Sequence, residues 1–206
     1  ATGAGKTTLI DLLPRYYDCT EGEVLIDGVN VKELTKEQIE RRISLAPQKA
    51  VLFKGDIKSN ITYGGDADDA RIERALRISQ STFVEDKTDG ILSEVAQGGT
   101  NFSGGQKQRL SIARAVYKDA EIYIFDDTFS ALDYKTDMLV RKAIREEMSD
   151  KTVVIVAQRI GTIKNADRIL VLDDGKAVGL GKHDELLRTC PVYKDIALSQ
   201  LSKEEL

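Results

Sequence analysis

Two adjacent carboxylates follow a short apolar run in the segment IYIFDDTFSALD, residues 122–133. The apolar residues predict a buried strand, and a strand that ends in an acid places a carboxylate at the edge of a sheet. Mg²⁺ prefers oxygen ligands and is commonly held through water, because it keeps much of its hydration shell. Asp126, the first acid, is therefore the predicted magnesium ligand, and Asp127, the second, is a candidate for chemistry on a bound water.

A phosphate-binding loop is predicted at the start of the chain, which opens on ATGAGKTT. Gly5, Lys6 and Thr7 match the end of the P-loop template G-x-x-x-x-G-K-[ST], whose first Gly would fall just before Ala1. Glycines let backbone N–H groups converge on phosphate oxygens, and the following helix adds its positive end. Lys6 would reach the β- and γ-phosphates, and the Thr7 hydroxyl would bind Mg²⁺. The predicted nucleotide-binding residues of this loop are Thr2, Gly3, Ala4, Gly5, Lys6, Thr7 and Thr8.

Either motif alone has a plainer interpretation. A Gly-rich turn can simply cap a helix, and two acids at a strand end can simply be solvated. The motifs occur together, however, in the order in which a P-loop and a Walker B strand follow each other, and this favours a nucleotide site with Asp126 as its Walker B acid. Because the P-loop is incomplete and no leader precedes it, we expect the chain to be a fragment of a longer protein.

Strands are predicted by apolar runs that are rich in β-branched residues. These runs lie at 23–27, 43–46, 121–126, 152–157 and 168–172. Asp27-Gly28 and Asp174-Gly175 each stand between two short apolar runs and predict tight hairpin turns.

Helices are predicted between these strands by apolar residues at helical spacing, in 72–76, 110–117 and 140–148. Thr35 and Gln38 have the spacing of a capping box, which predicts the start of a further short helix. Strands that alternate with helices predict an α/β fold with a mainly parallel sheet.

Composition argues against several classes of protein. The net charge of the 206 residues is −4, and with no basic face indicated, nucleic acid is not an expected partner. The longest aliphatic run, VVIVA at 153–157, is too short to span a bilayer, so any membrane role would belong to a part outside this chain. Cys19 and Cys190 lack metal-ligand spacing, which favours reduced thiols in a cytosolic setting.

A second anion site is predicted at residues 102–106, FSGGQ. Ser103 would cap a helix whose Gly104 and Gly105 expose backbone N–H groups at its positive end. The stretch resembles the signature motif of ATP-binding cassette (ABC) proteins, usually written LSGGQ, with Phe102 in place of the Leu. Two phosphate-binding helix ends in one chain suggest two chains arranged head to tail, each nucleotide lying between the P-loop of one and the signature of the other.

The resemblance extends over the whole chain. Gln48 matches the Q-loop glutamine, which in the family senses Mg²⁺ and the γ-phosphate, and residues 130–133, SALD, match the D-loop. The resemblance implies ATP and Mg²⁺ as cofactors, with Thr7, Gln48 and Asp126 at the metal. It adds these nucleotide-binding residues: Gln48, Ser103, Gly104, Gly105, Gln106 and Asp133.

The implied architecture is one ABC ATP-binding domain, residues 1–206, incomplete at its N-terminus. A P-loop NTPase core of mainly parallel sheet would occupy residues 1–48 and 116–206. Residues 49–115, where strand signals are few, would form a helical subdomain inserted between the Q-loop and the signature motif. In the family, the segment after Gln48 receives the coupling helices of a membrane domain.

Two residues depart from the family pattern, both in the hydrolytic role. Most ABC ATPases have Glu, the presumed general base, after the Walker B Asp; Asp127 is shorter, and a misplacement of about 1 Å can cost about 10²-fold in rate. Gln158, in AQR, replaces the family's switch histidine and can donate a hydrogen bond but carries no charge and shuttles no proton. The histidine that is present, His183, is better explained as a helix-start residue, and Gln97 stands where many homodimeric exporters have Glu.

These departures resemble the degenerate subunit of heterodimeric ABC exporters. They imply a cassette that binds MgATP, serves its partner's site with an intact signature and hydrolyses little at its own, with Asp127, Gln158 and Gln48 in the catalytic positions. The implied partners are a second, non-identical ABC subunit and a transmembrane domain that docks on the helical subdomain, at the cytoplasmic face of a membrane. Two alternatives stay open: a soluble non-transport ABC ATPase and a regulatory ATP-binding module without turnover.

Overall fold

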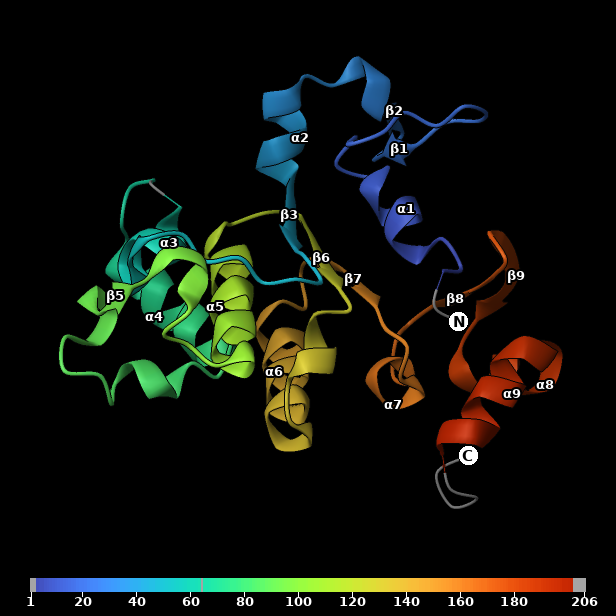
Figure 1. The fold of residues 1–206 in the computed structure, drawn as a ribbon. Coiled ribbons are helices and arrows are strands. Elements are labelled where there is room, and N and C mark those ends of the chain that lie inside the picture. The colour runs from blue at the N-terminus through green and yellow to red at the C-terminus, as the bar shows by residue number, and fades with distance from the viewer. Residues whose placement is uncertain (1–2, 64, 202–206) are drawn as a thin grey trace. The chain divides into compact units, whose positions relative to one another are not determined.

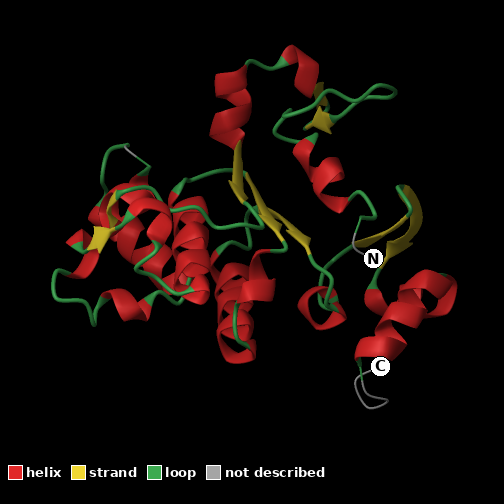
Figure 2. Ribbon diagram, viewed as in Figure 1, coloured by secondary structure: helices red, strands yellow, loops and turns green. Residues whose placement is uncertain are grey.

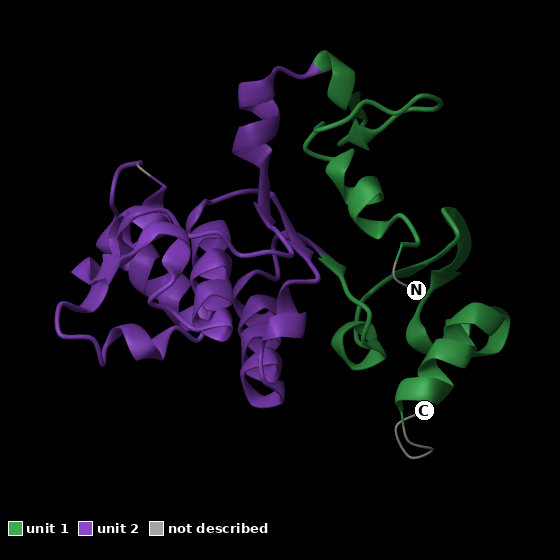
Figure 3. Cartoon of the chain, viewed as in Figure 1, with its two compact units in different colours: residues 1–33, 155–206 green, residues 34–154 purple. Residues whose placement is uncertain are grey.

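The computed structural model describes residues 3–63 and 65–201. The chain divides into two compact units (Figure 3), unit 1 with residues 1–33 and 155–206 and unit 2 with residues 34–154. Both units contain helices and short strands (Figure 2). Each unit is described by itself below.

A sheet in the order β3-β6-β7 runs through unit 2 (Figure 1). Its strands are β3 Ile43–Ala46, β6 Ile122–Asp126 and β7 Thr152–Val156, the last of which continues into unit 1. β3 and β6 pair in parallel, with Ile43 opposite Ile122 and Ala46 opposite Phe125. β6 is the middle strand and is buried from Tyr123 onward, as expected for a strand covered on both faces. The predicted α/β fold with a parallel sheet is confirmed.

Helix α5, Gly104–Tyr117, is the central helix of unit 2 and packs against α3, α4 and β3. Leu110, Ala113 and Val116 recur at helical spacing along it and are buried, as predicted. The other helices of unit 2 are α2 Lys36–Arg42, α3 Ile57–Thr62, α4 Asp69–Ile78 and α6 Tyr134–Glu147.

Side chains at the helix starts explain where these helices begin. The predicted capping box of α2 is present: Thr35 N donates to Gln38 Oε1 over 2.8 Å, and Gln38 N donates to Thr35 Oγ1 over 3.2 Å. Asp56 caps α3 and Asp68 caps α4 in the same manner, each accepting a backbone N–H from the first turn. Such caps satisfy donors that have no partner within the helix.

Short elements connect the helices of unit 2. β4 Gly55–Asp56 pairs antiparallel with β5 Glu94–Val95, so a small sheet lies inside the segment that the sequence predicts to be mostly helical. Single 3-10 turns are η2 Thr82–Val84, η3 Gly90–Leu92, η4 Gln97–Gly99 and η5 Thr128–Ala131. Unit 2 begins before residue 49 and ends after residue 115, and the boundaries of the helical subdomain remain a prediction.

Arg114 of α5 forms hydrogen bonds with the segment that follows Gln48. Its guanidinium donates to Val51 O over 2.9 Å and to Asn60 O and Oδ1 over 2.7 Å and 2.8 Å. Asn60 in turn accepts from Phe53 N and donates to Phe53 O, both over 2.8 Å. Burial lowers the pKa of Arg114, so the hydrogen bonds compensate a charge that is partly removed from water.

Two Asp-Gly hairpins lie in unit 1, as predicted. β1 Leu25–Ile26 pairs antiparallel with β2 Val29–Asn30, and β8 Ile169–Asp173 with β9 Lys176–Gly181. The turn residues have positive φ, 51° and 79° at Asp27-Gly28 and 45° and 72° at Asp174-Gly175. A two-residue turn between twisted strands needs this left-handed pair, which Gly and Asp tolerate well.

An apolar cluster in unit 1 is contributed by β8 and three helices, α7 Ile160–Ile163, α8 His183–Thr189 and α9 Pro191–Gln200. Its buried members are Ile160, Ile169, Val171, Leu186, Cys190, Tyr193 and Ala197. Helix α1 Lys6–Asp11 and the turn η1 Val31–Glu33 also belong to this unit. Across residues 3–63 and 65–201, no helix combines the length and the apolar character that a membrane span requires.

We predict that Arg114→Met loosens the segment after Gln48. The variant removes the donor for two backbone carbonyls and a side-chain oxygen, and a buried acceptor left without a donor costs about 1–3 kcal/mol. Hydrogen-exchange mass spectrometry should therefore show roughly tenfold faster exchange in residues 51–62.

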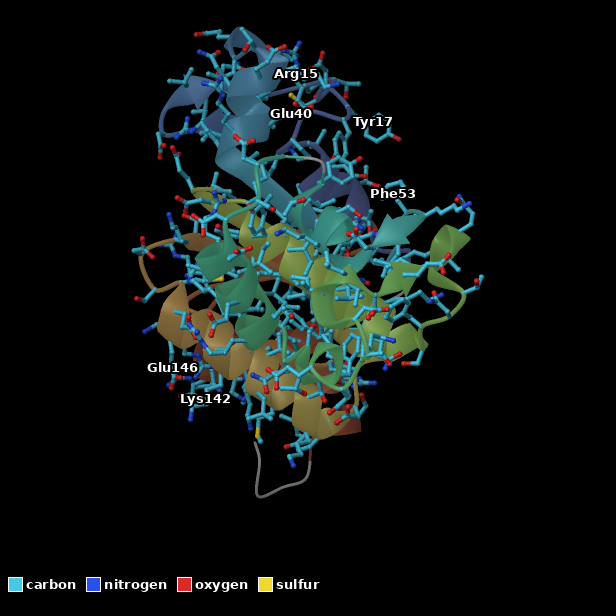
Figure 4. The ribbon with its side chains drawn as sticks, turned by 90° about the vertical axis from the view of Figure 1, so that its left-hand side faces the viewer. Arg15, Tyr17, Glu40, Phe53, Lys142 and Glu146 are labelled. Carbon is cyan, nitrogen blue, oxygen red and sulfur yellow. The ribbon has the colours of Figure 1, made fainter. Side chains whose placement is uncertain are left out.

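Lys142→Met is the matched control, since it also replaces a cation on a helix of unit 2. Lys142 Nζ lies 3.9 Å from Glu146 Oε1 on the same helix, α6 (Figure 4). The two side chains are 67% and 62% exposed. Such a pair contributes about 0–1 kcal/mol, and exchange should stay near that of the parent. Equal protection of residues 51–62 in both variants would contradict the role given to Arg114.

Candidate nucleotide-binding site

The carboxyl ends of β3 and β6 are joined by Thr128. Its hydroxyl lies 3.1 Å from Ala46 O and 3.2 Å from Asp126 O, and its side chain is fully buried. Asp126 closes β6 and is 5% exposed. The hydroxyl thus fixes the backbone that carries the predicted magnesium acid, a contact that the sequence pattern gives no signal for.

Asp127 and Gln48 meet at the same edge of the sheet. Gln48 Nε2 donates to Asp127 Oδ2 over 3.3 Å, although the two residues are far apart in the sequence. Asp127 has a left-handed backbone, with φ 44° and ψ 25°, and Ser130 Oγ donates to its carbonyl oxygen over 2.7 Å. Asp adopts this conformation more readily than most residues, because its short side chain forms local hydrogen bonds.

The signature motif, residues 102–106, begins helix α5 as predicted. Ser103 and Gln106 form a capping box: Gln106 N donates to Ser103 Oγ over 3.3 Å, and Ser103 N donates to Gln106 Oε1 over 3.0 Å. The amide oxygen of Gln106 is therefore engaged within the motif. Phe102 is buried, with its ring centroid 6.2 Å from that of Phe83 and 4.4 Å from Lys87 Nζ, so it packs inside unit 2.

The two glycines of the signature leave the start of α5 open. A Cβ at Gly104 would meet no described atom within 4 Å, and one at Gly105 would lie 3.7 Å from Ala131 O, an ordinary contact. Neither residue has a positive φ. Gly in a helix costs about 1 kcal/mol relative to Ala, and no packing requirement among the described residues explains it here.

Asp133 of the predicted D-loop caps helix α6. Its carboxylate accepts Thr136 N–H over 3.0 Å. The hydrogen bond from the Thr136 side chain, followed by those from the backbone, holds the pKa of Asp133 below its usual value. In the structure, Asp133 is therefore the N-cap residue of α6.

The P-loop belongs to unit 1 and turns as the sequence predicts. Gly3 and Gly5 have φ of 85° and 86°, and Gly5 is the N-cap of α1, which begins at Lys6. Left-handed glycines turn successive N–H groups toward one side, which is the backbone arrangement found in concave anion sites. Ala4 is buried beneath this turn, and the predicted residue Thr2 lies outside the described residues.

Gln158 also belongs to unit 1 and precedes helix α7. Its carbonyl oxygen accepts a hydrogen bond of 2.9 Å from Gln200 Nε2, at the end of α9. His183 is the first residue of α8, as its helix-start interpretation predicts, and its Nδ1 lies 2.8 Å from Tyr193 Oη. Burial raises the pKa of Tyr193 to about 12, and both rings are part of the packing of unit 1.

The structure thus groups the predicted site residues by unit. Gln48, Asp126, Asp127 and the signature motif lie in unit 2, while the P-loop and Gln158 lie in unit 1. A carboxylate at a strand end and a hydroxyl next to a phosphate loop are the hard oxygen ligands that Mg²⁺ takes. These features together are those of a P-loop nucleotide-binding protein.

Comparison with known proteins is consistent with this class. The family model of the ABC transporter matches residues 1–130. An uncharacterized ABC transporter ATP-binding protein of Mycobacterium tuberculosis is 47% identical over 205 residues, which cover 97% of this chain and 35% of that protein. An ATP-dependent lipid A-core flippase of Burkholderia orbicola is 42% identical over 204 residues, which cover 98% and 34%.

A solved structure gives the same result. A bacterial Atm1-family ABC exporter with ATP bound is similar to this chain with a TM-score of 0.93 and 36% identity, over 98% of this chain and 36% of that one. The chain therefore belongs to the ABC transporter family and is an ATP-binding domain similar to those of ABC exporters. It spans about a third of the length of the relatives it matches.

We predict that Thr128→Val weakens the response of ATP binding to Mg²⁺. Val keeps the shape of Thr but has no hydroxyl, so the carbonyl oxygens of Ala46 and Asp126 lose the single donor that they share, and the Asp126 carboxylate shifts. A loss of about 1 kcal/mol should raise the Mg²⁺ concentration for half-maximal ATP retention by roughly fivefold, measured by filter binding. Thr128→Ser keeps the hydroxyl and should respond as the parent does; equal effects of both variants would assign the role to packing instead.

Proposed function

We propose that this cassette binds MgATP at its own P-loop but hydrolyses it slowly, and that turnover occurs mainly at a second site which its signature motif completes. The observation that carries the proposal is the hydrogen bond of 3.3 Å from Gln48 to the Asp127 carboxylate. A side chain shorter than Glu, with an oxygen engaged by an amide, is poorly placed to take a proton from an attacking water.

Gln158 supports the same proposal. A neutral carboxamide can donate a hydrogen bond to a γ-phosphate oxygen but cannot add positive charge as the transition state develops. Because Gln200 holds its backbone, Gln158 is suited to binding a phosphate in a fixed geometry. The two residues together favour retention of ATP over cleavage.

Binding of MgATP is assigned to the residues that the motifs predict. The backbone N–H groups of residues 3–8 would cradle the phosphates, and Lys6 would contact the β- and γ-phosphates. Thr7 and Asp126 would hold Mg²⁺, with Gln48 close to both the metal and the γ-phosphate. The bound metal would neutralise charge on the phosphates.

The open helix start at Gly104 and Gly105 would serve the partner's nucleotide. Its N–H groups carry the positive end of the α5 dipole, and a phosphate can approach closely where no Cβ intervenes. Ser103 and Gln106 order the first turn of that helix through their capping box. We infer a non-identical partner, because two identical chains would both carry Asp127 and Gln158.

The transport role is proposed from the relatives. They include a protein named as a lipid A-core flippase and a structure named as an exporter, which favours a transporter over the soluble and regulatory alternatives. We propose that residues 1–48 and 116–206 form the P-loop core and that the helical subdomain, residues 49–115, receives a transmembrane domain at the cytoplasmic face of a membrane. A lipid-like amphiphile is the substrate class that the flippase's name favours.

We predict that Asp127→Asn changes the steady-state ATPase rate of the assembled transporter by less than about twofold, because this acid contributes little to turnover. Replacing the partner's catalytic acid should lower the rate by about 10²-fold or more. Phosphate release in detergent or lipid measures both. Asp126→Asn is the control in this chain, since loss of a magnesium ligand should reduce ATP retention at this site. A large loss of turnover in Asp127→Asn would contradict the proposal.

We predict that Gly105→Asp blocks turnover without unfolding the domain. A carboxylate at the start of α5 would repel the partner's γ-phosphate, so ATPase activity should fall by about 10²-fold. Gly105→Ala introduces the same Cβ without the charge, and its thermal unfolding should match that of the parent because the nearest atom is an ordinary contact away. Full activity of Gly105→Asp would show that the signature serves no nucleotide.

A further inference from the structure

One carboxamide holds the backbone on both sides of Arg159. Gln200 Nε2 donates to Gln158 O over 2.9 Å, and Gln200 Oε1 accepts Ile160 N–H over 2.8 Å. In a parallel sheet, one residue pairs in the same way with two residues of the adjacent strand: it donates to the carbonyl of the first and accepts the N–H of the residue two positions later. The Gln200 side chain therefore substitutes for a strand along this short loop.

The start of helix α7 needs such a partner. The first N–H groups of a helix have no acceptor within it, and the N-cap Arg159 makes no side-chain cap hydrogen bond. Gln200 supplies the acceptor for Ile160 from a different helix. The same side chain then also fixes the carbonyl of Gln158.

Helix α9 is anchored firmly enough to maintain this contact. Pro191 stands in its first turn, and Tyr193 and Ala197 are buried in the same apolar cluster as Ile160. Leu201 N donates to Ala197 O over 2.8 Å, which closes the last turn around Gln200. Side chain and backbone of Ile160 are thus both fixed against α9.

We propose that Gln200 is a positioning residue for Gln158 and sets how long MgATP stays at this chain's own site. The inference rests on the proposed contact of Gln158 with the γ-phosphate. A neutral amide attracts the phosphate through the direction of its N–H bonds, and a hydrogen bond weakens steeply when that angle changes. A loosened backbone at Gln158 therefore shortens retention of the nucleotide.

The test measures release of bound nucleotide from this chain in the assembled transporter. Radiolabelled 8-azido-ATP with Mg²⁺ is bound and chased with unlabelled ATP, and photocrosslinking followed by separation of the subunits reports what this chain retains. Gln200→Met has nearly the same length without the hydrogen bonds and should release nucleotide on the order of fivefold faster. Ser199→Ala, in the same turn, removes a hydroxyl that donates to Ile196 O over 2.7 Å and should match the parent.

A double variant tests whether Gln200 acts through Gln158. Gln158→Ala should release nucleotide faster than the parent, and adding Gln200→Met should change that rate no further, because the side chain through which Gln200 acts is then absent. Additive effects, or parental release from Gln200→Met beside fast release from Gln158→Ala, would overturn the inference and leave the proposed function in place. Parental release from Gln158→Ala would overturn the inference together with the proposed contact of Gln158 with the γ-phosphate, while the proposed function would still rest on Asp127.

Gln200→Glu separates positioning from stability. The carboxylate keeps one oxygen as the acceptor for Ile160 N–H. Its second oxygen stands where the amide of Gln200 donates to Gln158 O, so that hydrogen bond is lost. Thermal unfolding should stay near that of the parent, while release should be as fast as in Gln200→Met. Parental release from Gln200→Glu would overturn the inference.

Discussion

A carboxylate has to be kept at the end of an apolar strand where little water reaches it. Asp126 is 5% exposed, and removing a charge from water is costly unless hydrogen bonds or a cation compensate it. The fully buried Thr128 hydroxyl, 3.1 Å and 3.2 Å from the last carbonyl oxygens of β3 and β6, defines where that carboxylate lies. Gln48 and Asp127 meet at the same edge of the sheet.

The two helix starts that are predicted to bind phosphate use glycine for different reasons. Gly3 and Gly5 have positive φ, so the P-loop needs glycine in order to turn. The signature glycines lack positive φ and lie in open space or ordinary contact, so nothing in this chain's backbone requires them. In the proposed function, the first arrangement encloses the phosphates bound by this chain, and the second stays open to a phosphate from outside the chain.

Asp127 and Gln158, the two positions that depart from the family pattern, are each hydrogen-bonded to a further glutamine. Gln48 donates to the Asp127 side chain, and Gln200 pairs with the backbone around Gln158. Hydrogen bonds of this kind fix geometry but transfer no proton at neutral pH, because a carboxamide does not titrate. In the proposed function, the site is ordered for holding ATP, and the lost proton chemistry belongs to the partner's site.

The sequence by itself determined what depends on neighbours a few residues apart. The turns at Asp27-Gly28 and Asp174-Gly175, the capping boxes that begin with Thr35 and Ser103 and the apolar strand before Asp126 all appear where the pattern predicts them, because backbone preference and caps act locally. The motifs also sufficed to indicate the family. Tertiary structure alone decided the contacts between distant segments, among them Arg114 with Asn60, Thr128 with Ala46, Gln48 with Asp127 and Gln200 with Gln158. A periodic pattern carries no information on which remote polar groups meet, since that depends on how the elements pack.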